Sequence, residues 1–100
     1  MKNYEISNAN YVLSQLLDEP LKGKFKFKVF NVKSELEKKA EVIGKTLEGV
    51  EDENEREEIM NQEQDVYVDK FTEDELEQID LSLRQIALLQ PIIQFEEGEI

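Results

Sequence analysis

The sequence predicts a mainly α-helical fold: a small single domain with a helix hairpin built on one long helix, a short strand-like segment and two short C-terminal helices. Apolar residues recur at helical spacing through the first half of the chain, and two capping boxes open short helices in the second half. No internal repeat and no linker between domains interrupts the 100 residues. Residues 1–100 are therefore expected to form one domain. Its core should be thin, because a chain of this size buries only about 60–65% of its unfolded surface.

The first predicted helix follows Ser7 and ends at residues 18–20. Pro20 pushes Glu19 out of the α region, which favours a chain break there. One face of this helix carries apolar residues at i, i+3 and i+4 spacing. These residues are Val12, Leu13, Leu16 and Leu17.

The long helix is predicted at residues 22–50, about 28 residues and ~42 Å in length. A strand-like alternation at residues 25–29 competes with it, but a longer helical seam has more matching positions. The seam consists of Phe25, Val29, Val32, Leu36, Ala40, Ile43 and Leu47. Gly49 is a plausible C-terminal stop. Phe27 and Phe30 lie off the seam, and the leucines of the first helix are expected to cover them.

The next two segments carry weaker patterns. Residues 51–64 are strongly charged and read as an acidic linker or a short polar helix, with a solvated loop at 51–55 and the helix at 56–64. Residues 66–71 are β-branched or aromatic at four of six positions, which predicts a short strand.

Two capping boxes then open the C-terminal helices. Thr72-Glu73-Asp74-Glu75 predicts a short helix that runs to Ile79, and Ser82-Leu83-Arg84-Gln85 predicts a second one at residues 83–90, ended by Pro91. Residues 96–100 read as a frayed acidic tail.

This order of elements resembles that of small uncharacterised bacteriophage or prophage proteins. The resemblance lies in the long lysine-dotted helix, the Asp-Val-Tyr-Val-Asp stretch at 65–69, the Phe-Thr-Glu-Asp-Glu-Leu helix start at 71–76, and the Leu-Leu-Gln-Pro-Ile-Ile close at 88–93. It covers about three quarters of the chain and includes no diagnostic motif, and Gln90 stands where an acidic residue is usual. The resemblance implies phage origin and a small helical fold, and it transfers no functional residue.

Charge is divided between the two halves. Residues 1–50 hold nine basic and seven acidic residues, for a net +2, and residues 51–100 hold three and seventeen, for a net −14. The basic run is Lys22, Lys24, Lys26, Lys28 and Lys33. It is read as a solvated helix face, as a contact with the acidic half of another subunit, or as a site for an anionic ligand.

Six acidic residues are candidates for binding a protein partner. They are Glu53, Glu55, Glu57, Glu58, Asp65 and Asp69. They are read either as a mimic of a nucleic-acid backbone that occupies a cationic groove, or as a solvated surface. A third set is apolar and is expected in the core or in an interface. It comprises Leu83, Ile86, Leu89, Ile92 and Ile93.

Several chemistries are disfavoured by composition. The chain has no His and no Cys, its four glycines are isolated, and the acidic run from Asp52 lacks the glycine of an EF-hand loop. We therefore expect no enzymatic activity, no cofactor and no metal. The net charge of −12 opposes direct nucleic-acid binding. No apolar run approaches the ~20 residues that span a bilayer, which predicts a cytoplasmic protein without membrane contact.

The function expected from these observations is that of a phage-encoded, non-catalytic protein-binding module, plausibly an inhibitor of a host defence enzyme in the host cytoplasm. One alternative is a virion structural or assembly accessory protein. A further alternative is an oligomeric sponge for a nucleotide signal. A homo-oligomer is expected, because small cores are often supplemented by self-association.

Overall fold

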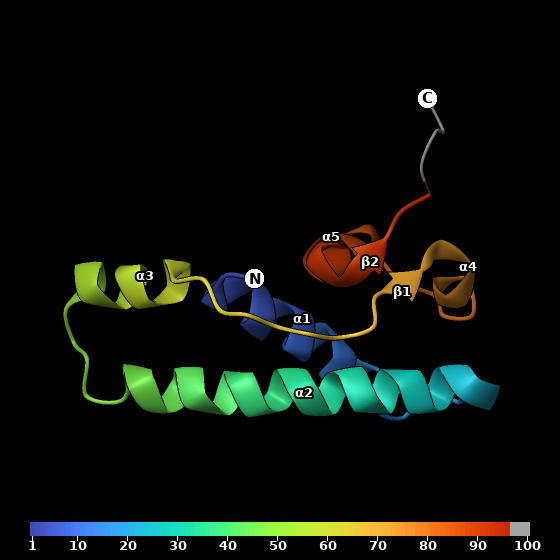
Figure 1. The fold of residues 1–100 in the computed structure, drawn as a ribbon, viewed down its shortest axis with the longest axis horizontal. Coiled ribbons are helices and arrows are strands. Elements are labelled where there is room, and N and C mark those ends of the chain that lie inside the picture. Colours follow the sequence, from blue (N-terminus) through green and yellow to red (C-terminus); the bar gives the residue numbers. More distant parts are fainter. Residues whose placement is uncertain (97–100) are drawn as a thin grey trace.

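The computed structural model describes residues 1–96 and confirms a mainly helical fold. The helices are α1 (Asn3–Gln15), α2 (Gly23–Leu47), α3 (Glu53–Asn61), α4 (Glu73–Leu76), α5 (Leu83–Leu89) and the 3₁₀ turn η1 (Gln90–Ile92), and the strands are β1 (Phe71–Thr72) and β2 (Ile93–Gln94). The long helix α2 forms one layer, and the remaining elements lie along one side of it (Figure 1). None of the helices within residues 1–96 is long and apolar enough to cross a membrane.

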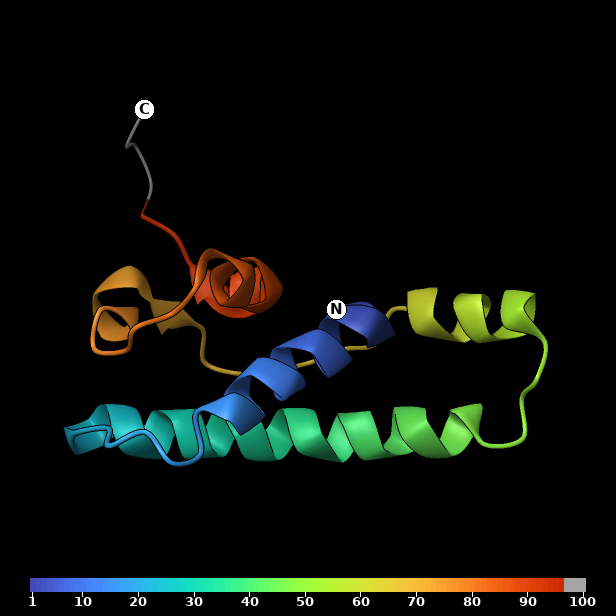
Figure 2. The ribbon, with the colours of Figure 1, turned by 180° about the vertical axis from the view of Figure 1, so that it is seen from behind.

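Helices α1 and α2 form the predicted hairpin, and α1 crosses α2 obliquely (Figure 2). Helix α1 begins at Asn3, so the predicted start after Ser7 is wrong. The earlier start has a local cause, because the backbone N–H of Lys2 donates to the Glu5 carboxylate at 2.8 Å and this contact caps the first turn. The added turn brings Ile6 into the core, where it is fully buried.

The helical seam of α2 is confirmed, and the competing strand interpretation is wrong. Five of its seven residues are buried, and Ala40 and Leu47 are half-buried. The helix begins at Gly23 and ends at Leu47, which is shorter than the predicted range of 22–50. Gly49 follows with a φ of 76°, a left-handed conformation that ends helices readily.

The expected cover over Phe27 and Phe30 is absent. Their side chains are 68% and 67% exposed, and Leu17, which was expected to contact them, is also exposed. Each residue of an α-helix is rotated by about 100° from the one before it. Phe27 therefore lies on the side of the helix almost opposite the seam. Helix α1 packs beside the seam and does not reach that face.

Helix α3 begins at Glu53, so the predicted loop at 51–55 is too long. Asp52 supplies the cap, with its carboxylate accepting from the backbone N–H of Asn54 at 3.0 Å. The helix ends at Asn61, three residues before the predicted end. None of its residues is buried, and Ile59 and Met60 are half-buried.

The predicted strand at residues 66–71 is wrong for residues 66–70, which are extended but unpaired. Only Phe71 and Thr72 form a strand, β1, which pairs in parallel with β2 through Phe71 opposite Ile93. The crossover between them passes through α4 and α5. Strand β2 was not predicted, because a two-residue strand after a proline turn carries no readable pattern.

Both capping boxes are confirmed. In the first, the Glu75 N–H donates to the Thr72 hydroxyl at 3.1 Å and the Thr72 N–H donates to the Glu75 carboxylate at 2.9 Å. Ser82 and Gln85 repeat the arrangement. Helix α4 ends at Leu76 instead of Ile79.

Helix α5 ends at Leu89, one residue before the predicted end at residue 90, and Pro91 is the second residue after it. Pro91 lies inside η1, near the start of that turn, where its missing N–H is tolerated. Of the predicted tail at 96–100, only Glu96 lies within the described residues. Its backbone N–H donates to the Glu73 carboxylate at 2.6 Å.

Candidate functional site

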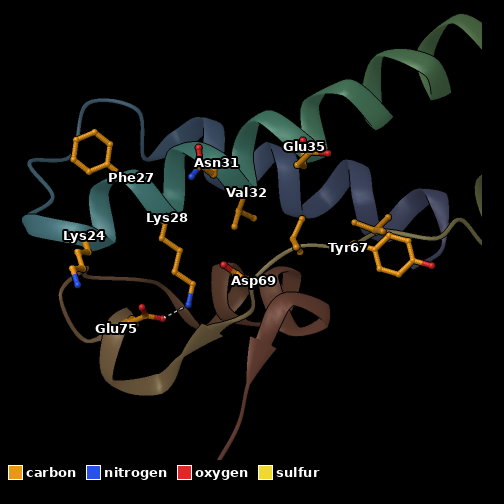
Figure 3. Close-up of a pocket in the computed structure, with 11 residues that line it drawn as sticks. Lys24, Phe27, Lys28, Asn31, Val32, Glu35, Tyr67, Asp69 and Glu75 are labelled. Atoms are coloured by element: carbon orange, nitrogen blue, oxygen red, sulfur yellow. Dashed lines mark hydrogen bonds and ion pairs between the residues drawn. The ribbon is translucent and has the colours of Figure 1, made fainter.

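An open groove of about 810 Å³ lies between α2 and the extended segment that leads into β1 (Figure 3). Helix α2 contributes one wall and the extended segment contributes the other. The lining residues are Lys24, Phe27, Lys28, Asn31, Val32, Glu35, Val66, Tyr67, Val68, Asp69 and Glu75. The walls thus combine apolar side chains with three carboxylates and two ammonium groups.

Lys28 links α2 to α4 at one end of the groove. Its ammonium group lies 2.8 Å from the Glu75 carboxylate and 5.8 Å from the centre of the Phe71 ring. Burial alone would raise the pKa of Glu75, but the hydrogen bonds from Lys28 and the Thr72 backbone, together with the charge of Lys28, hold this pKa below its ordinary value of 4.5. Glu75 is therefore a structural anion and a poor proton donor.

The basic run is not gathered into one site. Lys22, Lys24 and Lys26 are exposed, whereas Lys28 is engaged by Glu75. Lys33 is only 8% exposed, and its ammonium group lies 3.1 Å from the Asn10 side-chain oxygen and 3.3 Å from the Glu37 carboxylate. Lys28 and Lys33 are thus engaged within the molecule, whereas Lys22, Lys24 and Lys26 remain exposed as candidates for an external contact.

The acidic side chains of α3 remain available. Glu53, Glu55, Glu57 and Glu58 are all exposed, and none of them forms an ion pair within the part of the chain that the structure describes. Arg56, the basic residue of α3, donates to the backbone carbonyls of Leu47 at 3.2 Å and Val50 at 2.9 Å. It therefore caps the end of α2 and leaves the carboxylates of its own helix uncompensated.

Asp65 and Asp69 do not lie on α3 with the other acidic candidates. Both are exposed on the extended segment that follows it, and Asp69 lines the groove. The six acidic candidates are thus divided between a helix and an extended chain, and the groove itself was not predicted from the sequence.

The C-terminal apolar set divides between core and surface. Leu89, Ile92 and Ile93 are buried, whereas Leu83 is 87% exposed and Ile86 is at the surface. Ile86 and Ile93 line a second, mainly apolar hollow of about 320 Å³ together with Phe95. Leu89, Ile92 and Ile93 therefore belong to the core, and an interface role for Leu83 and Ile86 stays a prediction.

Asn3 is an important residue that the sequence analysis missed. It is buried, its side-chain amide donates to the carbonyl of Ile59 at 2.6 Å, and its side-chain oxygen accepts from the Gln64 amide at 2.6 Å. These bonds fasten α3 and the start of the extended segment to α1. Asn3 lies three residues before Ile6 and therefore on the apolar face of α1. This spacing is the sequence feature that indicates its burial.

No group of three or more acidic residues within residues 1–96 is placed to hold a metal ion. The chain matches no protein-family model, no curated protein and no solved structure.

Proposed function

We propose that this protein is a non-catalytic protein-binding module and that α3 presents its acidic side chains to a cationic surface of the partner. The observation that carries this proposal is the unequal use of charge. Lys28 and Lys33 are paired inside the molecule, whereas the four glutamates of α3 are exposed and unpaired within the described residues. Because none of the residues of α3 is buried, packing does not explain its acidic composition.

The charge of α3 favours rapid association with a basic partner. The whole chain carries a net charge of −12, so a cationic surface is attracted before contact is made. Exposed charges act over about 8 Å at physiological salt, so the attraction is strongest close to the α3 side chains themselves. The absence of His and Cys from the sequence, and the ion-paired state of Glu75, support a binding role over a catalytic one.

The resemblance to phage proteins supports a host protein as the partner. A defence enzyme with a cationic nucleic-acid groove has the chemistry that an acidic helix would occupy. Under this proposal the protein acts as an inhibitor by covering that groove, without contacting nucleic acid itself.

A triple substitution tests the proposal. Glu53→Lys, Glu55→Lys and Glu57→Lys together should slow association with the partner, which is identified first by affinity capture from infected cells and then purified. Each exposed charge is worth about 0.2–1 kcal/mol, so three should slow binding measurably. Circular dichroism of the variant is compared with that of the parent, because Glu53 and Glu55 lie in the first turn of α3, where lysine opposes the helix dipole.

The matched control reverses the same number of charges elsewhere. Glu19→Lys, Glu41→Lys and Glu48→Lys change exposed positions outside α3. Parent-like binding by the α3 variant would reject the proposal. Equal losses in both triple variants would show that net charge, and not α3, governs association.

A structural or assembly role is the second candidate, and the shape of the molecule favours it. Lys22, Lys24 and Lys26 are exposed at the start of α2, and α3 lies near the opposite end of that helix in a molecule 43 Å long (Figure 1). Opposite charges at two ends favour head-to-tail contacts between copies. Sedimentation across a salt series separates the candidates, since charge-driven assembly should loosen as salt rises.

A further inference from the structure

We propose that residues 65–69 form an open strand edge that binds an extended basic segment of a partner protein by strand addition along the groove beside α2. This site is distinct from α3 and stands independently of the function proposed above. The partner strand would supply backbone hydrogen bonds to this segment and place alternate apolar side chains against the groove.

The backbone of residues 65–69 has no hydrogen-bond partner within residues 1–96. Pairing ends at Gln64, whose N–H donates to the Met1 carbonyl at 2.8 Å, and strand pairing resumes at Phe71. Extended backbone with free donors and acceptors is a template for another strand.

The side chains of the segment alternate as they do in a half-buried strand. Val66 and Val68 are half-buried against the protein, whereas Tyr67 is 86% exposed and Asp65 and Asp69 are exposed. The segment also continues directly into β1, which already pairs with β2. Strand pairing is therefore established at one end of this extended stretch and unused along the rest.

The groove supplies an apolar floor for the incoming side chains. Val32 is a buried part of the wall formed by α2 (Figure 3), and Val66 and Val68 contribute apolar side chains from the wall formed by the extended segment. An extended segment with apolar residues at every second position could place them here, while the intervening residues face solvent and the charged rim.

The charges around the groove select a basic occupant. Lys28 is neutralised by Glu75, and Glu35 lies 3.4 Å from the ammonium group of Lys38. The exposed carboxylates of Asp65 and Asp69 on the segment itself then face the single ammonium of Lys24 on the lining. The net charge of −12 adds to this bias. Lysine or arginine at the solvent-facing positions of the added strand would meet these carboxylates.

A second copy of the chain fits the site less well. It would bring a further −12 of charge, and an antiparallel pair centred on Tyr67 would set Asp65 directly opposite Asp69. Like charges in opposed positions destabilise strand pairs. We therefore assign the edge to a basic segment of another protein.

Synthetic peptides test the proposal on the intact protein. The probe is a capped octapeptide of alternating lysine and valine, and the control is its counterpart of alternating glutamate and valine. The lysine peptide should bind and should slow hydrogen exchange at amides of residues 65–69, whereas the glutamate peptide should not bind. Asp69→Lys should weaken binding, and Asp80→Lys, an exposed position outside the groove, should not.

Backbone methylation distinguishes strand addition from simple charge attraction. Alternate N–H groups of a strand point to opposite edges. Methylating one alternate set of peptide nitrogens should therefore weaken binding about tenfold, since two or more backbone hydrogen bonds would be lost. Methylating the other set should leave binding within about twofold, which corresponds to less than one such bond.

Three outcomes would overturn the proposal. One is equal affinity of all methylated peptides, and another is unchanged exchange at residues 65–69 in the bound state. The third is a dimer of the protein alone whose amides at 65–69 are protected, because a second copy would then occupy the edge. The α3 triple variant keeps this site intact, so its behaviour toward the peptide separates the two binding surfaces.

Discussion

The basic run of α2 and the acidic helix α3 are both dense in charge, but they differ in how far their charges are paired within the molecule. Lys28 and Lys33 lie beside the buried seam of α2 and are engaged by Glu75, Asn10 and Glu37. The glutamates of α3 are exposed and free of ion pairs within the described residues.

The difference follows from the apolar pattern around the charges. Helix α2 has a continuous seam that other elements must cover, so polar groups at the edge of the seam acquire neighbours. Helix α3 has only two half-buried apolar residues within the described structure, Ile59 and Met60. A charged run is thus available for a partner when no apolar stripe accompanies it.

The largest effect is expected from a charge placed in the seam itself. Leu36→Asp should destabilise the fold by more than about 3 kcal/mol, because Leu36 is fully buried and an unpaired carboxylate would replace its packing. Val42→Asp is the matched control on the exposed face of the same helix and should cost less than about 1 kcal/mol. Urea unfolding followed by circular dichroism measures both. Cooperative, parent-like unfolding of Leu36→Asp would show that the seam is not the core.

A smaller effect is expected where α3 is fastened to α1. Asn3→Leu should destabilise by about 1–3 kcal/mol, because it leaves the Ile59 carbonyl and the Gln64 amide without their partner. Gln62→Leu, at an exposed position beside α3, is the control. Hydrogen exchange should also quicken throughout α3 in Asn3→Leu. Unchanged exchange there would mean that other contacts hold the helix.

The sequence predicted the parts of the fold that depend on local pattern. The seam of α2 rests on repeated spacing, and the two capping boxes rest on Thr72 with Glu75 and Ser82 with Gln85. Each of these signals lies within a few residues or repeats many times, so each was readable without the structure.

The parts that were missed depend on partners distant in the chain. Strand pairing of Phe71 with Ile93 and the bonds of Asn3 to Ile59 join residues more than twenty positions apart. The burial of Lys33 depends likewise on where α1 crosses α2. The candidate groove was missed for the same reason, since its two walls come from α2 and from residues 66–69.

Substitutions in the basic run should affect stability differently at Lys33 and at Lys26. Lys33→Met should destabilise by about 0.5–1.5 kcal/mol, because the Asn10 side-chain oxygen loses its donor in a partly buried place. Lys26→Met, at an exposed position of the same run, should stay within about 0.5 kcal/mol of the parent. Thermal or urea unfolding of the two variants measures the contrast. Equal effects would mean that Lys33 is as free as Lys26.

The smallest effect concerns pH and the pair Lys28 and Glu75. The folded-state pKa of Glu75 lies below its ordinary value of 4.5, so the pair stabilises the protein above that pH and loses its contribution as pH falls through the folded pKa. Lys28→Met should therefore lower stability near neutral pH by no more than about 1 kcal/mol, since both side chains are partly exposed.

The difference in unfolding free energy between Lys28→Met and the parent should shrink as the pH falls below 4.5, because protonated Glu75 is no longer stabilised by the Lys28 ammonium group. Lys26→Met provides the reference, since Lys26 makes no ion pair within residues 1–96. The small difference in unfolding free energy between this variant and the parent should not depend on the protonation of Glu75. Unfolding curves at several pH values, with the Glu75 pKa followed by NMR, measure both quantities. A gap that stays constant across the acid range would show that Lys28 supports α4 through packing on Phe71 and not through its charge.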